Sequence, residues 1–261
     1  MRNAHIDNVD HIQRPLIAIG TDYPPGFQLP LHSHRRAQLL YGATGVMQVF
    51  TRQGNWLVPP QHAVWLPPQM PHAVKMVGVS TRSLYIEPDA LPAAAASPLC
   101  QVVGISPLMR QLLIAAVEMP LEYQRQGRDG ALAALLLHEL AGLQPLPLHI
   151  PLPADRRLSA LCQQFLQQPE AQASPQAWAD RLYMSLRSFS RLFRSETGMS
   201  FSQWRQRARV VLALAQLAAG RSVTQVAMEM GYESSAAFST MFRRVLGRAP
   251  SSYLAEERRD G

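Results

Sequence analysis

Between residues 15 and 87, hydrophobic positions come in short runs or alternate with polar ones, and Gly, Pro or polar residues separate the runs. Short runs of this kind are typical of β-strands, and alternation within them is typical of half-buried ones. Turn residues return about every ten positions, which favours a small antiparallel barrel or sandwich. The clearest predicted strands cover residues 46–51, 56–58, 63–66, 73–77 and 82–86.

After residue 98 the spacing of hydrophobic residues becomes helical. Ser106 followed by Pro107 is a favourable N-cap and first-turn pair, and apolar residues then share one helix face. A second helix is predicted for about residues 129–143. We expect this segment to pack on the β-structure and to offer an apolar face for dimerisation; the alternative is that it only covers an open sheet. Four residues would serve either role: Met109, Leu112, Leu113 and Leu136.

A Pro-rich stretch, QPLPLHIPLP at residues 144–153, has four prolines in ten positions. Such a stretch is extended and semi-rigid, and it therefore indicates a domain boundary. The pattern predicts two domains, an all-β N-terminal domain with trailing helices and an all-α C-terminal domain. The predicted segments are residues 1–98 for the β-domain, 99–143 for the helical region, 144–154 for the linker and 155–261 for the C-terminal domain.

The C-terminal domain contains one helical pattern twice. In residues 174–198, Ser174 and Pro175 begin a short helix, a turn leads to a second N-cap at Ser185, and Gly198 closes the second helix. The spacing of apolar residues makes this second helix amphipathic. Its apolar face carries Leu186, Phe189, Leu192 and Phe193, and its polar face carries Arg187, Ser190, Arg191 and Arg194.

Residues 222–247 repeat this pattern, with Ser222 and Ser234 as N-caps, Gly231 in the turn and Gly247 at the end. The second helix is predicted to bury Phe238, Met241, Phe242 and Val245, and its polar face carries Ser235, Ser239, Thr240 and Arg243. Residues 201–219 form one predicted helix between the repeats, about 28 Å long. Because successive major-groove faces of DNA lie about 34 Å apart, two helix-turn-helix units on such a spacer are suited to adjacent grooves of one duplex.

The charge distribution supports a nucleic-acid partner. The net charge is +7; residues 1–154 hold 10 Lys or Arg and 9 Asp or Glu, whereas residues 155–261 hold 15 Arg and 9 Asp or Glu. A basic half of a chain that also carries two helix-turn-helix patterns favours DNA binding over a plain helical domain.

Other features of the composition indicate a cytoplasmic protein. The chain has no apolar stretch of about 18 residues, the length that predicts a membrane helix. Its N-terminus lacks the apolar run of a signal peptide. The two cysteines, Cys100 and Cys162, are widely separated, which fits buried thiols in a reducing compartment.

Residues 179–210 and 223–254 resemble the DNA-binding domain of AraC/XylS-family transcriptional regulators. The most specific match is G-Y-x-S-x-x-x-F-S-x-x-F-R-R-x-x-G-x-x-P-x-x-Y at residues 231–253. The resemblance implies base contacts by Arg187, Ser190 and Arg191 in the first unit and by Ser235, Ala236 and Thr240 in the second. Phosphate contacts are expected from Arg194, Arg205, Arg243 and Arg244.

Two positions differ from the common pattern of this family. Family members often have arginine where Thr240 stands, so we expect the second unit to position the protein on DNA more than to read bases. Tyr183 stands in a turn where the family often has glycine, so we expect a slightly opened turn.

The N-terminal domain resembles a cupin. His32-x-His34-x3-Gln38, between Gly26 and Gly45, is similar to the first cupin motif, with Gln in place of the usual Glu. Pro67-x-Gln69-x2-His72 is similar to the second motif. In metal-binding cupins the ligands fall at the positions of His32, His34, Gln38 and His72. A His-x-His pair on one strand would place both rings on the same face.

Three interpretations of these histidines stay open. They bind a divalent transition metal, they line a metal-free pocket and form hydrogen bonds to an organic effector, or they are structural. Gln38 is a weaker ligand than Glu, and the second motif lacks its usual leading glycine and closing asparagine, since Gln61 and Met76 stand there. Regulators that resemble this chain commonly keep a cupin-like barrel as a sensor without metal.

The sequence therefore predicts a transcriptional regulator and no enzyme. A cupin-like barrel would bind a small molecule or metal, and two helix-turn-helix units would bind double-stranded DNA in a sequence-specific manner. Expected partners are RNA polymerase and a second copy of the chain, joined through residues 106–143. The alternative from another class is a cupin metalloenzyme, similar to a dioxygenase, with a helical accessory domain. A third interpretation is a constitutive DNA-binding protein whose barrel senses nothing.

Overall fold

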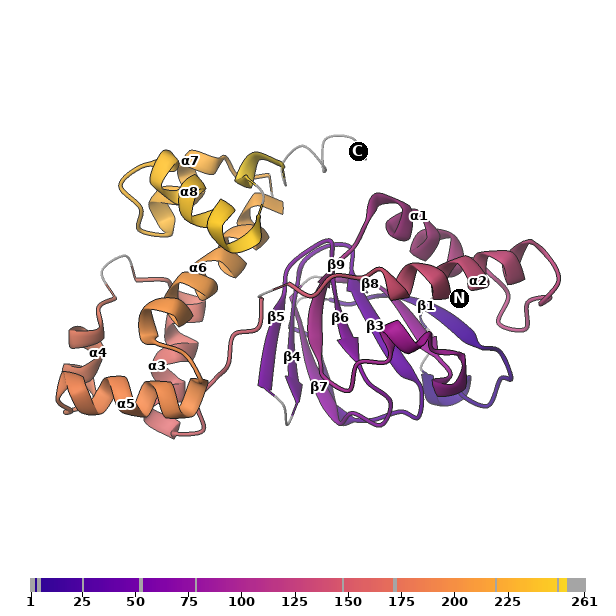
Figure 1. Cartoon of the computed structure of the whole chain (residues 1–261), viewed down its shortest axis with the longest axis horizontal. Coiled ribbons are helices and arrows are strands. Elements are labelled where there is room, and N and C mark those ends of the chain that lie inside the picture. Colours follow the sequence, from indigo (N-terminus) through magenta and orange to yellow (C-terminus); the bar gives the residue numbers. More distant parts are fainter. Residues whose placement is uncertain are drawn as a thin grey trace. The chain divides into compact units, whose positions relative to one another are not determined.

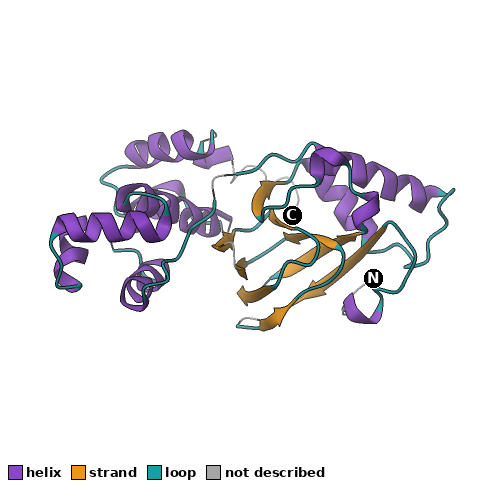
Figure 2. Ribbon diagram, turned by 60° about the horizontal axis from the view of Figure 1, so that its bottom comes forward, coloured by secondary structure: helices purple, strands orange, loops and turns teal. Residues whose placement is uncertain are grey.

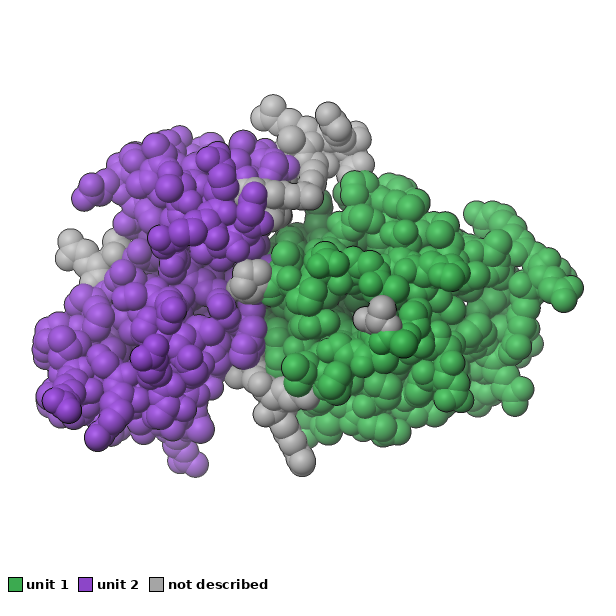
Figure 3. All heavy atoms as spheres, in the orientation of Figure 1, with its two compact units in different colours: residues 1–146 green, residues 147–261 purple. Residues whose placement is uncertain are grey.

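The chain folds into a β-rich unit formed by residues 1–146 and a helical unit formed by residues 147–261 (Figures 1 and 3). The computed structural model describes residues 3, 6–24, 26–51, 54–77, 79–146, 148–170, 173–218, 220–247 and 249–252. Within these residues, every strand belongs to the first unit (Figure 2). The prediction of a β-rich N-terminal domain and a helical C-terminal domain is confirmed.

Two antiparallel sheets build the β-rich unit, with strand orders β1-β8-β3-β6-β9 and β2-β7-β4-β5. The predicted strands are confirmed and are slightly longer than expected in four of five cases. The strands are β1 (Leu16–Asp22), β2 (Gln28–His32), β3 (Ala37–Gly42), β4 (Val46–Thr51), β5 (Gly54–Val58), β6 (His62–Leu66), β7 (His72–Val77), β8 (Ser80–Ile86) and β9 (Gln101–Gly104). Short 3-10 turns cover Ile6–Asn8, Pro88–Ala90 and Ala93–Ala95.

Helices α1 (Pro107–Ala116) and α2 (Arg128–Ala141) cover the five-stranded sheet, and their apolar residues join one core with β1, β3, β6, β8 and β9. The Ser106 side chain accepts a hydrogen bond from the backbone N–H of Met109 at 3.0 Å, which confirms the predicted cap. Met109, Leu113 and Leu136 are fully buried in this core. These three residues therefore cover the sheet and are inaccessible to a second chain.

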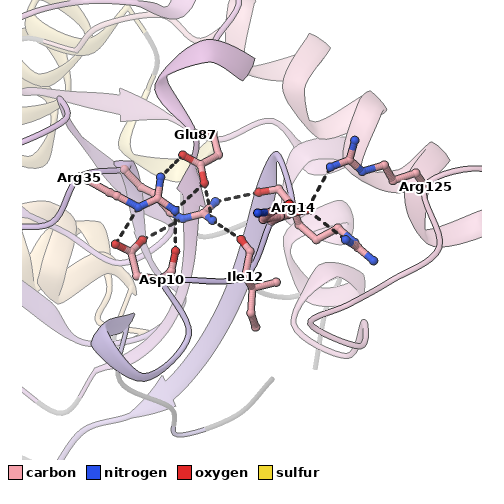
Figure 4. Close-up of polar contacts among 8 residues, drawn as sticks. Asp10, Ile12, Arg14, Arg35, Glu87 and Arg125 are labelled. Atoms are coloured by element: carbon pink, nitrogen blue, oxygen red, sulfur yellow. Dashed lines mark hydrogen bonds and ion pairs between the residues drawn. The ribbon is translucent and has the colours of Figure 1, made fainter.

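A charged network fastens residues 10–14 to the loop before β3 and to Glu87, which follows β8 (Figure 4). The guanidinium of Arg36 is fully buried and forms ion pairs with Asp10 at 3.0 Å and Glu87 at 2.6 Å. It also donates to the backbone carbonyls of Ile12 at 2.7 Å and Arg14 at 2.9 Å. Removing one partner of such a buried pair costs about 3–5 kcal/mol, so this network fixes the segment firmly.

The helical unit consists of α3 (Arg156–Gln167), α4 (Pro175–Arg181), α5 (Leu186–Thr197), α6 (Phe201–Ala218), α7 (Val223–Glu229) and α8 (Ser235–Leu246). Helix α6 contacts α5 as well as α7 and α8, so one helix joins both helix-turn-helix pairs. The first pair packs on an aromatic cluster, and in the second pair Phe238 packs against Phe242. The cluster contains Phe165, Trp178, Phe189, Phe193, Phe201 and Trp204.

For the helical unit, two expectations are wrong and a third concerns residues outside the described part of the chain. Leu186 is not buried, because it is the first residue of α5 and 43% of it is exposed. The turn at Tyr183 is not opened: Tyr183 has φ +55° and Gly231 has φ +77°, so both turns use the same left-handed conformation. Tyr253, the last residue of the family motif, and Ala219, the last of the predicted spacer helix, lie outside the described residues.

Candidate functional site

Helix α5 presents an arginine-rich surface to solvent. The Ser185 side chain caps it by accepting from the N–H of Ser188 at 3.1 Å, and Gly198 ends it with φ +71°. Phe189 and Phe193 are fully buried, which fixes the rotation of the helix about its axis. The opposite face is exposed at Arg187, Ser190, Arg191 and Arg194, so the structure brings these predicted contact residues together.

Helix α8 repeats this local structure with different side chains. Ser234 accepts from the N–H of Ala237 at 3.1 Å, and Gly247 ends the helix with φ +75°. Ala236 and Thr240 are exposed at the positions that correspond to Arg187 and Arg191. The Thr240 hydroxyl donates to the Ala236 carbonyl at 3.0 Å. Ser235 is half-buried, and Arg243 and Arg244 are exposed in the last turn.

Arg205 belongs to α6 and not to α5 or α8. It is half-buried on α6, donates to the backbone carbonyl of Ala173, and places its guanidinium 5.8 Å from the ring centroid of Phe201. These contacts within the unit occupy the side chain that the sequence assigned to phosphate binding, and the assignment stays a prediction.

In the β-rich unit, His32, His34 and His72 converge. His32 ends β2 and pairs in register with His72, the first residue of β7. His34 follows in the loop before β3, so the expectation that His32 and His34 share a strand is wrong. The ring centroids of His32 and His72 are 4.2 Å apart, those of His34 and His72 5.3 Å, and those of His32 and His34 6.2 Å.

Each of these rings is oriented by a backbone carbonyl. The Nδ1–H groups of His32, His34 and His72 donate to the carbonyls of Pro30 at 2.8 Å, Arg36 at 2.7 Å and Met70 at 2.8 Å. A neutral ring held in this way keeps Nε2 as an acceptor. Burial lowers the pKa of His34 and lowers the pKa of His72 to about 4, so both rings are neutral at neutral pH.

Gln38 on β3 links His34 to β8. Its carboxamide lies 3.2 Å from Nε2 of His34, and it also contacts the hydroxyls of Tyr85 at 3.0 Å and Ser83 at 3.3 Å. A half-turn of the carboxamide lets its NH₂ group donate to His34 while its oxygen accepts from both hydroxyls. Tyr85 and Ser83 were not predicted as site residues. The β3–β8 register places Tyr85 opposite Gln38, and only a prediction of that register would have identified it.

The donor chemistry of this cluster suits a transition metal, because imidazole nitrogens with a carbonyl-bound Nδ1–H are common metal ligands. The arrangement suits it less well. Among the described residues, no group of three or more His, Cys, Asp or Glu side chains is placed to hold a metal ion. Gln38 adds only a neutral amide.

None of the helices in the described part of the chain is long and apolar enough to cross a membrane.

Comparison with known proteins relates both units to regulators. A helix-turn-helix domain model matches residues 178–256, and a model of the AraC-like ligand binding domain matches residues 15–141. The chain is 32% identical over 227 residues to the HTH-type transcriptional regulator NimR of Escherichia coli (strain K12), covering 87% of this chain and 82% of NimR. It is 36% identical over 103 residues to the HTH-type transcriptional regulator RipA of Corynebacterium glutamicum, covering 40% of this chain and 31% of RipA.

Among solved structures, the DNA-binding domain of AdpA in complex with a target DNA is 36% identical; the match covers 40% of this chain and 96% of that domain, with a TM-score of 0.37. A ligand-binding domain joined to a helix-turn-helix domain defines a transcriptional regulator that binds DNA. The chain belongs to the AraC family of these regulators. The predicted family and the predicted DNA-binding function are therefore confirmed.

Proposed function

We propose that this regulator works in the cytoplasm as an effector-controlled, sequence-specific DNA-binding protein without enzymatic activity. Helix α5 reads bases through Arg187, Ser190 and Arg191. The observation that carries this proposal is the rigid presentation of those side chains opposite the buried rings of Phe189 and Phe193. Arginine forms two hydrogen bonds with guanine in the major groove, which suits it to base recognition.

The effector binds at His32, His34, Gln38 and His72. The Nε2 atoms of His32 and His72 are oriented acceptors suited to an organic molecule that carries hydrogen-bond donors, while Nε2 of His34 already contacts the Gln38 carboxamide at 3.2 Å. Imidazole nitrogens are also the type of ligand that divalent transition metals take. Binding at this site shifts the population of conformations that bind the promoter or contact RNA polymerase.

The regulator acts as a homodimer through the outer face of α1 and α2. Leu108, Ile114 and Leu135 support this role, because they are 51%, 41% and 41% exposed whereas the inner face of both helices is buried on the sheet. Single exposed apolar residues are common on protein surfaces, so measurement of the oligomeric state in solution decides whether this face forms a dimer.

Elemental mass spectrometry of the untagged protein tests the effector site. A metal-bound site predicts near-stoichiometric metal in the wild type and its loss in both His32→Ala and His72→Ala. If the site binds an organic effector, the wild type holds no metal after incubation with divalent ions. A screen of small molecules then finds one that raises the melting temperature of the wild type and leaves that of both variants unchanged. If metal or effector binding survives both substitutions, these histidines do not form the effector site.

A further inference from the structure

The turn of the first helix-turn-helix unit carries an aromatic side chain in an unfavourable place. Tyr183 lies between α4 and α5, has φ +55°, and is 96% exposed. A left-handed backbone is costly for any residue with a Cβ atom and is a marked outlier for a bulky one. Because the ring is almost fully in solvent, burial does not offset that cost.

The second unit has the usual solution at the same position. Gly231 stands there with φ +77°, and both turns are closed by the same hydrogen bond. The N–H of Met184 donates to the carbonyl of Ala179 at 2.9 Å, and the N–H of Tyr232 donates to the carbonyl of Ala227 at 2.9 Å. Glycine therefore satisfies this backbone, and the tyrosine at 183 is not required by the fold.

Tyr232 shows how a tyrosine in such a turn behaves when its role is packing. Its ring lies edge-on to Phe238 with centroids 5.5 Å apart, and the guanidinium of Arg209 lies 5.6 Å from its centre. Tyr183 makes no comparable ring contact among the described residues, in keeping with its exposure. The two tyrosines thus differ in kind.

The position of Tyr183 favours a contact with bound DNA. It precedes Ser185, the N-cap of α5, by two residues, and exposed Arg187 follows in the first turn of the helix. In helix-turn-helix proteins the N-terminal end of the recognition helix enters the major groove, so the residues just before it lie near the sugar–phosphate backbone. Tyrosine hydroxyls are regular donors to phosphate oxygens.

We propose that Tyr183 is a DNA-contacting residue whose hydroxyl donates to a backbone phosphate at the edge of the groove that α5 enters. This inference rests on the proposed role of α5. Strained residues persist where function retains them, and an exposed strained tyrosine beside a recognition helix fits that pattern.

Two variants of the full chain test the proposal: Tyr183→Gly and Tyr183→Phe. Binding is measured to a duplex selected from a random library and to an unrelated duplex, and thermal unfolding is measured in parallel. Tyr183→Gly should melt at a higher temperature than the wild type, because it removes the left-handed strain. Both variants should bind both duplexes about tenfold more weakly, as expected for one lost hydrogen bond to a charged group.

Wild-type affinity in either variant overturns the proposal, and so does a Tyr183→Gly protein that melts below the wild type. Arg191→Ala serves as the matched control for the docking of α5. If Arg191→Ala weakens binding and Tyr183→Phe does not, only the tyrosine contact fails. If neither substitution changes binding, α5 does not contact DNA and the proposed function fails with it.

Discussion

The first helix-turn-helix unit, α4 and α5, and the second, α7 and α8, share one backbone plan. Each second helix begins at a capping serine, buries two phenylalanines on one face, and ends at a left-handed glycine. Both first helices also begin at a capping serine, Ser174 or Ser222. The local rules of capping and amphipathic spacing therefore fix the geometry of both units in the same way.

What the units present to solvent differs. Arg187 and Arg191 on α5 correspond to Ala236 and Thr240 on α8. Within α8 (Ser235–Leu246) the arginines, Arg243 and Arg244, lie in the last turn. A long cationic side chain early in a recognition helix can reach base edges, whereas one at the end of the helix lies nearer the phosphates. From this comparison we propose that the first helix-turn-helix unit reads sequence and that the second holds the protein on the duplex.

The largest expected effect separates these roles directly. Arg191→Ala should weaken specific DNA binding by about 1–3 kcal/mol and relax the preference at one base position. Thr240→Ala, the matched change in the second unit, should weaken binding by less than about 0.5 kcal/mol, the usual effect of a surface substitution. Equal losses in the two variants, measured by titration against one duplex, would contradict the division of roles.

A smaller effect concerns phosphate contacts. Arg243→Ala should weaken binding to all duplexes alike and reduce the slope of log affinity against log salt by about 1. Arg205→Ala is informative beside it, because Arg205 already donates to Ala173. An unchanged slope with a lower melting temperature assigns Arg205 to the fold, and a slope reduced by about 1 assigns it to DNA. If Arg243→Ala leaves the slope unaltered, α8 does not lie against the backbone.

The smallest expected effect on DNA affinity comes from the turn of the second helix-turn-helix unit. Gly231→Ala places a Cβ atom on a left-handed backbone and should destabilise the protein by about 1–2 kcal/mol. Because the added methyl group neither forms nor removes a hydrogen bond to DNA, DNA affinity at temperatures well below unfolding should change little. Thermal unfolding and a binding titration on the same sample measure both. A Gly231→Ala variant as stable as the wild type would show that the turn relaxes out of the left-handed region.

The helices of both units were predictable because the signals for their ends are local. Ser106, Ser174, Ser185, Ser222 and Ser234 each cap the helix expected of them. The prediction of strands was less complete. It missed β1 and β3, because β1 is buried at five consecutive positions and β3 at all six. Such strands lack the alternation that marks half-buried ones, so sequence periodicity did not separate them from their surroundings.

The effector site could be predicted only in part. His32, His34, Gln38 and His72 stand out by their spacing, but their partners depend on strand register. Tyr85 meets Gln38 because β3 pairs with β8, and that pairing joins residues far apart in the chain. Contacts between distant segments carry no local signal, so neither this partner nor the ion pairs that hold Asp10 could be predicted from the sequence.

The most direct test of the unequal roles is selection of binding sites from a random duplex library by the full chain, with the wild type and Arg191→Ala side by side. We predict strong base preference concentrated in one half of the selected site, and its loss or relaxation in Arg191→Ala. The other half should show little preference in either protein. Equal preference in both halves, unaltered by Arg191→Ala, would contradict the claim that α5 reads sequence and α8 holds the duplex.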